Sequence, residues 1–170
     1  MSTGVGIAEL FASRDAGVCL KKEPVAGSQE PECHPTHSED ATIELGRSIG
    51  RLLPRKACVL LIGNLGAGKT TLAKGIIQGL GFAEPEDVTS PTFTLIHEYG
   101  EGKVYHIDLY RLDEARQIAT LGLDDIFDRE AVVLIEWGER FPDLMPHPRM
   151  EIRMAAVGGD DRQIEIENIL

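Results

Sequence analysis

Apolar residues recur with a helical period over residues 41–52, and this repeat ends before Pro54. Ser38, or Thr36 together with Glu39 three residues later, can cap the start of a helix there. A helix with one apolar stripe buries that stripe against a neighbouring layer. We therefore expect a helix that begins near Ser38 and covers one face of a sheet.

A short run of apolar residues, CVLLI at 58–62, predicts a strand that is buried on both faces. A glycine-rich loop follows it directly. From Thr70 to Leu80 the apolar positions return to a helical period, and Gly79 and Gly81 indicate where that helix ends. Strand, loop and helix therefore occur in the order that a phosphate-binding loop requires.

Further along the chain, the pattern of apolar and polar residues indicates two hairpins, one buried strand and one helical segment. They fall at residues 92–110, 149–169, 131–136 and 113–127 respectively. In the first hairpin, two extended stretches from Thr92 and from Lys103 are joined by a turn that contains two glycines. The second hairpin alternates apolar and charged side chains, as expected for strands with one face in water.

The length of 170 residues is typical of one domain. Residues 1–37 contain glycines, prolines and charged residues with little periodicity, and they are interpreted as a flexible N-terminal extension. Residues 38–170 are then expected to form one catalytic domain.

The chain is acidic, with 17 Lys and Arg residues against 28 Asp and Glu residues and a net charge of −11. Such a charge disfavours binding of nucleic acid by this chain alone, so any contact with RNA is expected to be shared with a partner. No apolar run is long enough for a membrane helix, and the N-terminus lacks the apolar segment of a signal peptide. The sequence is therefore interpreted as that of a cytoplasmic protein without membrane contact.

The segment GNLGAGKT, Gly63 to Thr70, matches the phosphate-loop pattern G-x-x-x-x-G-K-[ST]. Its glycines let successive backbone N–H groups point at phosphate oxygens, and the following helix adds its positive N-terminal end. Lys69 is expected to bridge the β- and γ-phosphates, and the hydroxyl group of Thr70 is expected to ligate Mg²⁺. The residues predicted to contact ATP are Asn64, Leu65, Gly66, Ala67, Gly68, Lys69, Thr70 and Thr71.

A phosphate loop also needs a carboxylate for the metal and a group that orients the attacking water. Asp108 and Glu136 each stand near the end of a predicted strand, and they meet at the loop if both strands end at the same edge of the sheet. Asp108, with the shorter side chain, is the better magnesium partner, while Glu136 can reach either the metal or the water. We therefore predict Lys69, Asp108 and Glu136 as catalytic residues, and Thr70, Asp108 and Glu136 as metal-binding residues. His97 and His106, on the first hairpin, are interpreted as sheet-face residues rather than catalysts.

Two further features are candidates for a switch or a partner contact. The segment TSPTFT, residues 89–94, places the hydroxyl groups of Thr89, Ser90 and Thr92 around Pro91, which fixes an extended turn. Such a segment either closes over the γ-phosphate or simply starts a strand. Trp137, the only tryptophan, directly follows Glu136, and it either packs in the core or contacts a ligand or partner.

Four segments together resemble the TsaE (YjeE) family, bacterial ATPases needed for making threonylcarbamoyladenosine (t6A) in tRNA. They are GNLGAGKTTLAKGI, VTSPTFTLIHEY, VYHIDLYRL and LIEWGERF, in this order and at this spacing, and the match covers about residues 38–157. The resemblance implies an α/β protein of one domain with a P-loop NTPase-like fold, in which helices flank a mixed β-sheet. It also implies ATP and Mg²⁺ as ligands, and partners of the TsaD and TsaB type.

In that family, TsaD and TsaB carry out threonylcarbamoyl transfer, and the ATPase keeps their complex turning over. The resemblance therefore implies contact with tRNA only through the complex, and weak turnover by this chain alone that responds to partners. It places residues 38–42 near the adenine, which makes Glu39 a candidate ATP contact. It also puts Trp137 at the family's Glu-Trp position, whereas Asn64 stands where an aspartate is common.

Two other functions stay open because they share the phosphate loop. A P-loop small-molecule kinase normally closes an arginine-bearing lid over the phosphoryl group, but the candidate arginines Arg111, Arg116, Arg129 and Arg140 are dispersed, and no lid insert is apparent. A nucleotide-controlled binding module with negligible turnover would use ATP only to shape a surface for a partner. Phosphate release measured with and without the partners separates the three functions.

Overall fold

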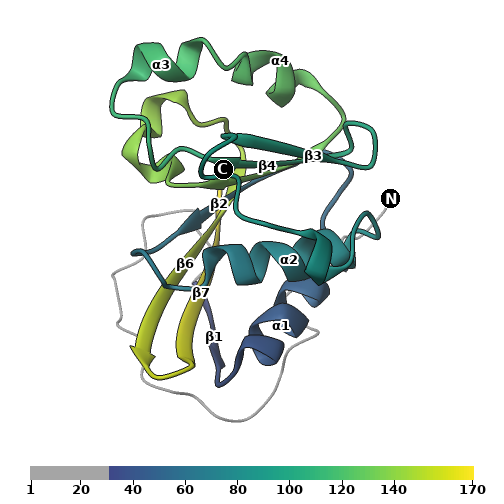
Figure 1. Ribbon diagram of the computed structural model, residues 1–170, viewed down its shortest axis with the longest axis vertical. Coiled ribbons are helices and arrows are strands. Elements are labelled where there is room, and N and C mark those ends of the chain that lie inside the picture. The colour runs from purple at the N-terminus through teal and green to yellow at the C-terminus, as the bar shows by residue number, and fades with distance from the viewer. Residues whose placement is uncertain (1–30) are drawn as a thin grey trace.

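The computed structural model describes residues 31–170, which form one seven-stranded sheet with helices on both faces (Figure 1). The strand order is β1-β7-β6-β2-β5-β4-β3. The strands are β1 (Glu32–Thr36), β2 (Ala57–Ile62), β3 (Ile96–Tyr99), β4 (Val104–Asp108), β5 (Val132–Glu136), β6 (Arg149–Gly158) and β7 (Asp161–Ile169). The helices are α1 (Glu39–Leu52), α2 (Lys69–Gly79), α3 (Ala115–Ala119) and α4 (Leu123–Asp128), with the 3₁₀ turns η2 (Pro85–Asp87), η3 (Gly138–Arg140) and η4 (Pro142–Leu144).

The sheet is mixed, as the resemblance implied. Its centre is parallel, because β5 pairs in parallel with β2 and with β4, and β2 also pairs in parallel with β6. Both edges are antiparallel: the predicted hairpins form as β3 with β4 and as β6 with β7. The carboxyl ends of β2, β4 and β5 therefore reach the same edge, where the loop after β2 begins.

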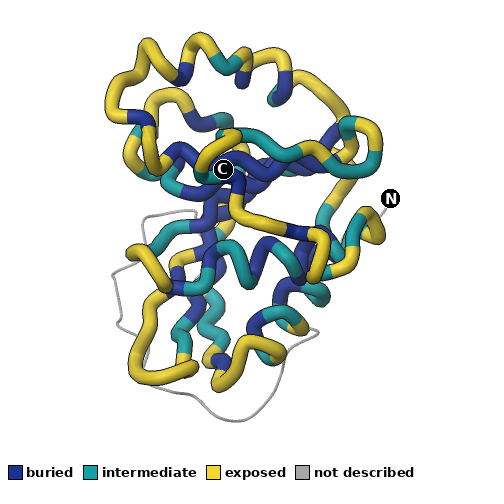
Figure 2. The backbone as a smooth tube through the Cα atoms, viewed as in Figure 1, coloured by how far each residue is buried: buried dark blue, intermediate teal, exposed yellow. Residues whose placement is uncertain are grey.

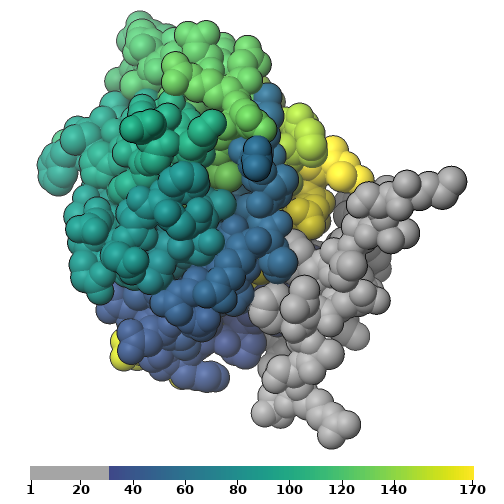
Figure 3. Space-filling model, turned by 90° about the vertical axis from the view of Figure 1, so that its right-hand side faces the viewer, coloured from purple at the N-terminus to yellow at the C-terminus, as the bar shows by residue number. Residues whose placement is uncertain are grey.

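Each face of the sheet carries its own apolar cluster. The central strands β4 and β5 between the clusters are buried along their whole length (Figure 2). Alternate residues of β2 point to opposite faces, so Val59 and Leu61 pack in the cluster under α1 and α2, while Leu60 packs in the cluster under α3 and α4. The expectation of a strand buried on both faces is confirmed. In the space-filling view, residues 80–110 (teal) cover the surface between α1 below and the α3–α4 region above (Figure 3). Within residues 31–170, no helix is long and apolar enough to cross a membrane.

Helix α1 begins where the sequence predicts, because the hydroxyl group of Ser38 accepts a hydrogen bond from the backbone N–H of Ala41. Its buried face differs from the predicted apolar stripe. Leu52 is 39% exposed, and the buried positions include two glycines that face α2. Ideal Cβ atoms on the four glycines of the α1–α2 contact would stand 2.1–2.5 Å from backbone carbonyl oxygens of the other helix; these are Gly46, Gly50, Gly75 and Gly79. The two helices pack this closely only because glycine lacks a side chain.

A methyl group at this helix contact is expected to destabilise the protein strongly. In Gly75→Ala, the new Cβ would stand 2.1 Å from the carbonyl oxygen of Ile43, so α1 and α2 must separate. We expect a loss of unfolding free energy of about 2 kcal/mol or more, in spite of the better helix propensity of alanine. Urea denaturation monitored by circular dichroism measures it. Lys74→Ala, one residue earlier in α2, is the control, and equal stability of the two variants would contradict the packing argument.

The predicted N-terminal boundary is wrong by one strand. Residues 32–36, expected to lie in the extension, form β1, which pairs antiparallel with β7 from Glu32 opposite Ile166 to Thr36 opposite Arg162. Thr36 also hydrogen-bonds the Thr42 hydroxyl group of α1 over 2.8 Å. The segment is not apolar, so its pairing depends on the free edge of a distant strand. Residues 1–30 of the predicted extension lie outside the described residues.

Two other predicted elements are shorter than expected. The first strand of the β3–β4 hairpin begins at Ile96 rather than Thr92, because Leu95 has a φ of 66° and its N–H donates to the carbonyl oxygen of Pro91, which bends the chain away from the sheet. The helical segment predicted at 113–127 is divided into α3 and α4. Gly122, with a φ of 67°, interrupts it.

Candidate functional site

The phosphate loop, residues 63–70, connects the carboxyl end of β2 to α2. Gly63 lies so close to β6 that a Cβ atom there would stand 2.5 Å from the carbonyl oxygen of Met154. Gly68 has a φ of 98° and caps α2 without any side-chain hydrogen bond. The first N–H groups of α2 therefore have no side-chain acceptor at the cap, and the positive end of the helix faces the loop.

Lys69 lies across the loop rather than in solvent. It is 4% exposed, and its Nζ donates to the carbonyl oxygens of Gly63, over 2.6 Å, and of Asn64, over 3.0 Å. The same nitrogen lies 4.2 Å from the centre of the Trp137 ring, in a cation–π contact. The ammonium group is thus held by neutral acceptors alone, which leaves its charge available to an anion.

Burial controls the electrostatics around Lys69. It lowers the pKa of the lysine below the ordinary value, and this effect is opposed by the carboxylates of Glu136, Glu139 and Asp108. Burial also raises the pKa of Glu139 in η3, although Lys69 is among the cations that lower it. One oxygen of Glu139 is buried without a hydrogen bond from the described residues. A bound anion next to Lys69 would favour its charged form.

The two predicted acids lie side by side. Asp108 ends β4 and Glu136 ends β5, and they are direct partners in the parallel register of these strands. Both residues are nearly fully buried, at 2% and 4% exposure, on the sheet face that α2 covers. The expectation that the two strands end at the same edge of the sheet as the phosphate loop is confirmed.

Glu136 is held by a hydroxyl group and an imidazole. Thr70 donates to its Oε1 over 2.9 Å, and Nε2 of His106 lies 2.8 Å from the same oxygen. Because a carboxylate oxygen accepts hydrogen bonds, Nε2 of His106 is the donor. The other oxygen, Oε2, accepts no hydrogen bond from residues 31–170.

His106 belongs to the site, which was not predicted from the sequence. It is a sheet residue, as interpreted, but it is fully buried and contacts the predicted catalytic carboxylate. A signal was present, because His106 stands two residues before Asp108 on the same strand and therefore on the same face. Its partner on β5 could not be known without the register.

Asp108 is held by the 89–94 segment. Its Oδ2 accepts hydrogen bonds from the hydroxyl groups of Thr92, over 2.7 Å, and Ser90, over 3.4 Å. Its Oδ1 accepts from the backbone N–H of Tyr110 over 2.8 Å. Of the two roles considered for this segment, starting a strand is therefore wrong, and its hydroxyl groups reach the acid beside the phosphate loop.

These groups line one cavity of about 360 Å³, which is within the usual range for small-molecule sites. Its lining includes most of the predicted residues: Leu65, Gly66, Gly68, Lys69, Thr70, Thr71, Ser90, Thr92, Asp108, Glu136 and Trp137. Two lining residues, Tyr110 and Arg162, were not predicted. Five predicted residues are not part of the lining: Asn64 and Ala67 in the loop, Thr89 and Pro91, and the exposed Glu39 at the start of α1.

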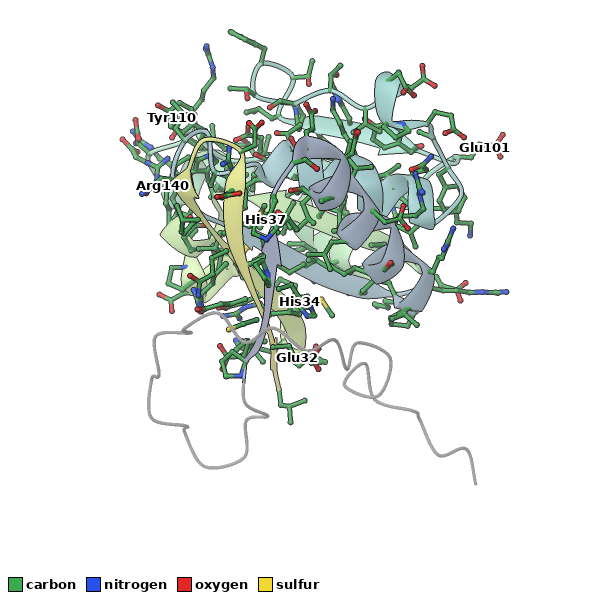
Figure 4. The ribbon with its side chains drawn as sticks, turned by 90° about the horizontal axis from the view of Figure 1, so that it is seen from below. Glu32, His34, His37, Glu101, Tyr110 and Arg140 are labelled. Atoms are coloured by element: carbon green, nitrogen blue, oxygen red, sulfur yellow. The ribbon has the colours of Figure 1, made fainter. Side chains whose placement is uncertain are left out.

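Trp137 has one side toward the core and one toward the cavity. It packs at the margin of the α3–α4 cluster and against the ring of Tyr110, with ring centres 5.1 Å apart and the two ring planes tilted by 46°. Arg140 donates to the carbonyl oxygen of Tyr110, and the two residues lie together at one end of the molecule (Figure 4). Trp137 has a φ of 65°, an unusual backbone for a bulky residue that often marks a functional position.

The residues that line this cavity fit Mg²⁺ and a nucleoside triphosphate. The oxygens of Thr70, Asp108 and Glu136 are hard donors of the kind that Mg²⁺ prefers, and they surround the same cavity. The loop, the positive end of α2 and Lys69 fit phosphate oxygens. Chemically, this set can hold a triphosphate and its metal, and it can orient a water for attack.

The chain matches the family model described as threonylcarbamoyl adenosine biosynthesis protein TsaE over residues 36–164. It is 42% identical to the tRNA threonylcarbamoyladenosine biosynthesis protein TsaE of Nostoc sp., over 75% of this chain and 80% of that protein. It is 36% identical to the protein of the same name from Treponema pallidum, over 77% of this chain and 96% of that protein. Among solved structures, it resembles YdiB of Bacillus subtilis, with a TM-score of 0.67 and 30% identity over 83% of this chain and 87% of that one.

Proposed function

Because this chain belongs to the TsaE family, we propose that it is an Mg²⁺-dependent P-loop ATPase that supports t6A modification of tRNA. The observation that carries the proposal is the pair of adjacent carboxylates, Asp108 and Glu136, that shares one cavity with the phosphate loop. A phosphate loop alone would be compatible with any nucleotide-binding protein, whether or not it hydrolyses the nucleotide. The buried carboxylates add the metal and water groups that hydrolysis requires.

The first task of the site is to hold the phosphates. The N–H groups of the loop and of the first turn of α2 would donate hydrogen bonds to the phosphate oxygens of ATP. Lys69 would add a positive charge beside the same oxygens. Thr70 and Asp108 would hold the metal, and Thr70 would then give up its hydrogen bond to Glu136. When bound, Mg²⁺ supplies positive charge that stabilises the phosphate oxygens during transfer.

The second task is to orient the water. His106 keeps Oε1 of Glu136 in place, so that Oε2 is free to accept a hydrogen bond from a water beside the γ-phosphate. Ser90 and Thr92 fix the Asp108 carboxylate, and their segment closes this side of the site. Glu136 thus has the role of base or water-orienting group, and Asp108 has the role of metal ligand.

Partner proteins of the TsaD and TsaB type complete the function. With a net charge of −11, the chain is poorly suited to bind tRNA directly, so we place tRNA contact in the complex and the reaction in the cytoplasm. Turnover by the chain alone is weak. Trp137 is suited to report the nucleotide state, because it contacts Lys69 of the loop and directly follows Glu136.

The test of this function is tRNA threonylcarbamoylation over many turnovers with purified TsaD- and TsaB-type proteins. We expect omission of this chain to stop modification after about the first round, and Trp137→Ala to lower the multiple-turnover rate by about tenfold, a larger effect than on ATP affinity. Trp137→Phe, which keeps a ring against Lys69, is the control. If omitting the chain changes nothing, the proposed role in modification is wrong, whereas phosphate release that needs a small acceptor would indicate a kinase.

A further inference from the structure

Arg162 brings a second cation to the cavity from a distant part of the chain. It is the second residue of β7, and it pairs with Thr36 of β1 on one side and with Ala156 of β6 on the other. A Cβ atom on Gly68 would stand 3.6 Å from the Nε of Arg162. The β6–β7 hairpin therefore places a guanidinium group against the last glycine of the phosphate loop.

The contacts of Arg162 leave most of its donors unused. Nη1 donates to the carbonyl oxygens of Gly159, over 2.8 Å, and Asp161, over 2.9 Å, both in its own turn. Within residues 31–170, the guanidinium group makes no ion pair with a carboxylate, and its Nε and Nη2 donate no hydrogen bond. The turn thus holds the side chain in place without neutralising it.

The charged side chains of the cavity lining balance one another before a nucleotide binds. Asp108 and Glu136 contribute two carboxylates, and Lys69 and Arg162 are the two basic residues in the described lining. A triphosphate adds several negative charges that Lys69 alone does not balance. Arginine stays ionised at any pH that proteins tolerate, and its planar fork matches two phosphate oxygens at once.

The other arginines considered as lid residues are engaged elsewhere. Arg111 lies over the Phe93 ring, Arg129 donates to the Tyr105 hydroxyl group, and none of the four lines the cavity. Arg116 pairs with Glu114, and Arg140 with Asp113. Arg162 is therefore the arginine that meets the nucleotide site.

We propose that Arg162 binds the phosphate chain of the nucleotide, as a second cation beside Lys69. The inference rests on the proposed function, since it concerns the same site. A guanidinium contact of this kind supplies charge-assisted hydrogen bonds from outside the loop and ties the β6–β7 hairpin to the nucleotide.

The test is nucleotide binding by Arg162→Gln, monitored by the fluorescence of Trp137, the only tryptophan and a residue of the same cavity. Glutamine keeps an N–H donor for the turn but removes the charge. We expect affinities for ATP and for inorganic tripolyphosphate, measured with Mg²⁺, to fall by about tenfold or more. Arg162→Lys should recover part of the loss, because it restores a point charge without the fork.

Arg55→Gln is the matched control, since this exposed arginine precedes β2 and lies at the opposite end of that strand from the loop. Unchanged tripolyphosphate affinity in Arg162→Gln would overturn the inference, whether or not its melting temperature changes. Loss of ATP affinity without loss of tripolyphosphate affinity would place the guanidinium group on the nucleoside instead and would also overturn it. If the wild-type protein binds no nucleotide at all, the proposed function fails as well.

Discussion

Lys69→Ala is expected to reduce ATP turnover by on the order of 10³-fold while the protein stays folded. In the structure, the ammonium group crosses the phosphate loop and is bound by the carbonyl oxygens of Gly63 and Asn64, which carry no net charge. Its positive charge therefore serves an anion rather than a structural ion pair. Alanine is a good helix former at the start of α2, so the helix itself should persist.

The measurement for Lys69→Ala combines equilibrium dialysis with labelled ATP, phosphate release and thermal denaturation. Lys74→Ala, in the same helix and with no hydrogen bond or ion pair among the described residues, is the control for loss of a lysine. A melting temperature near that of the wild type, together with lost binding, would support the assigned site. Wild-type affinity and turnover in Lys69→Ala would rule it out.

Glu136→Gln is expected to lower kcat by about 10²- to 10⁴-fold with nucleotide affinity changed only a few-fold. The amide oxygen of glutamine can still accept the hydrogen bonds from Thr70 and His106, so the variant should keep its geometry. What it loses is the carboxylate that orients the water. A small change in affinity with a large change in kcat is the signature of an interaction that matters in the transition state.

Asp108→Asn tests whether Asp108 and Glu136 have different roles. If Asp108 mainly holds Mg²⁺, the variant should need a higher magnesium concentration for nucleotide binding, while Glu136→Gln should not. Titrating both variants with Mg²⁺ decides this. Glu101→Gln, on the exposed turn of the β3–β4 hairpin (Figure 4), is the control for removal of a carboxylate. Equal losses of metal affinity in the two site variants would make Glu136 a metal ligand as well, and the division of roles proposed above would be wrong.

Much of the candidate site was predictable because it consists of local patterns. The phosphate loop lies between a strand and a helix that are its neighbours in sequence, so the order β2, loop, α2 needs no tertiary information. The two acids could be placed because each directly ends an apolar strand, and parallel strands deliver their ends to one edge. The start of α1 at Ser38 was equally local, since one hydroxyl group caps it.

The partners of these groups could not be predicted, because they depend on which strands pair and in which register. Thr70 and His106 meet on Glu136 only through the order β2-β5-β4 and the packing of α2 beneath it. The same limitation explains why the role of the 89–94 segment stayed open in the sequence, since the segment could equally have started a strand. Its contact with Asp108 arises from the left-handed turn at Leu95.

The sequence by itself determined the phosphate loop, its flanking strand and helix, and the two acids at strand ends, because short-range periodicity and glycine placement specify them. Only the tertiary structure decided the rest. The polar strand β1 exists because β7 offers it an edge, and α1 approaches α2 because four glycines face one another. Arg162 reaches Gly68 because β6 runs parallel to β2 and continues past its end, so β7 begins at the edge of the sheet where the loop lies. Each of these contacts joins residues far apart in the chain, and a pattern within one segment carries no information about the segment it will meet.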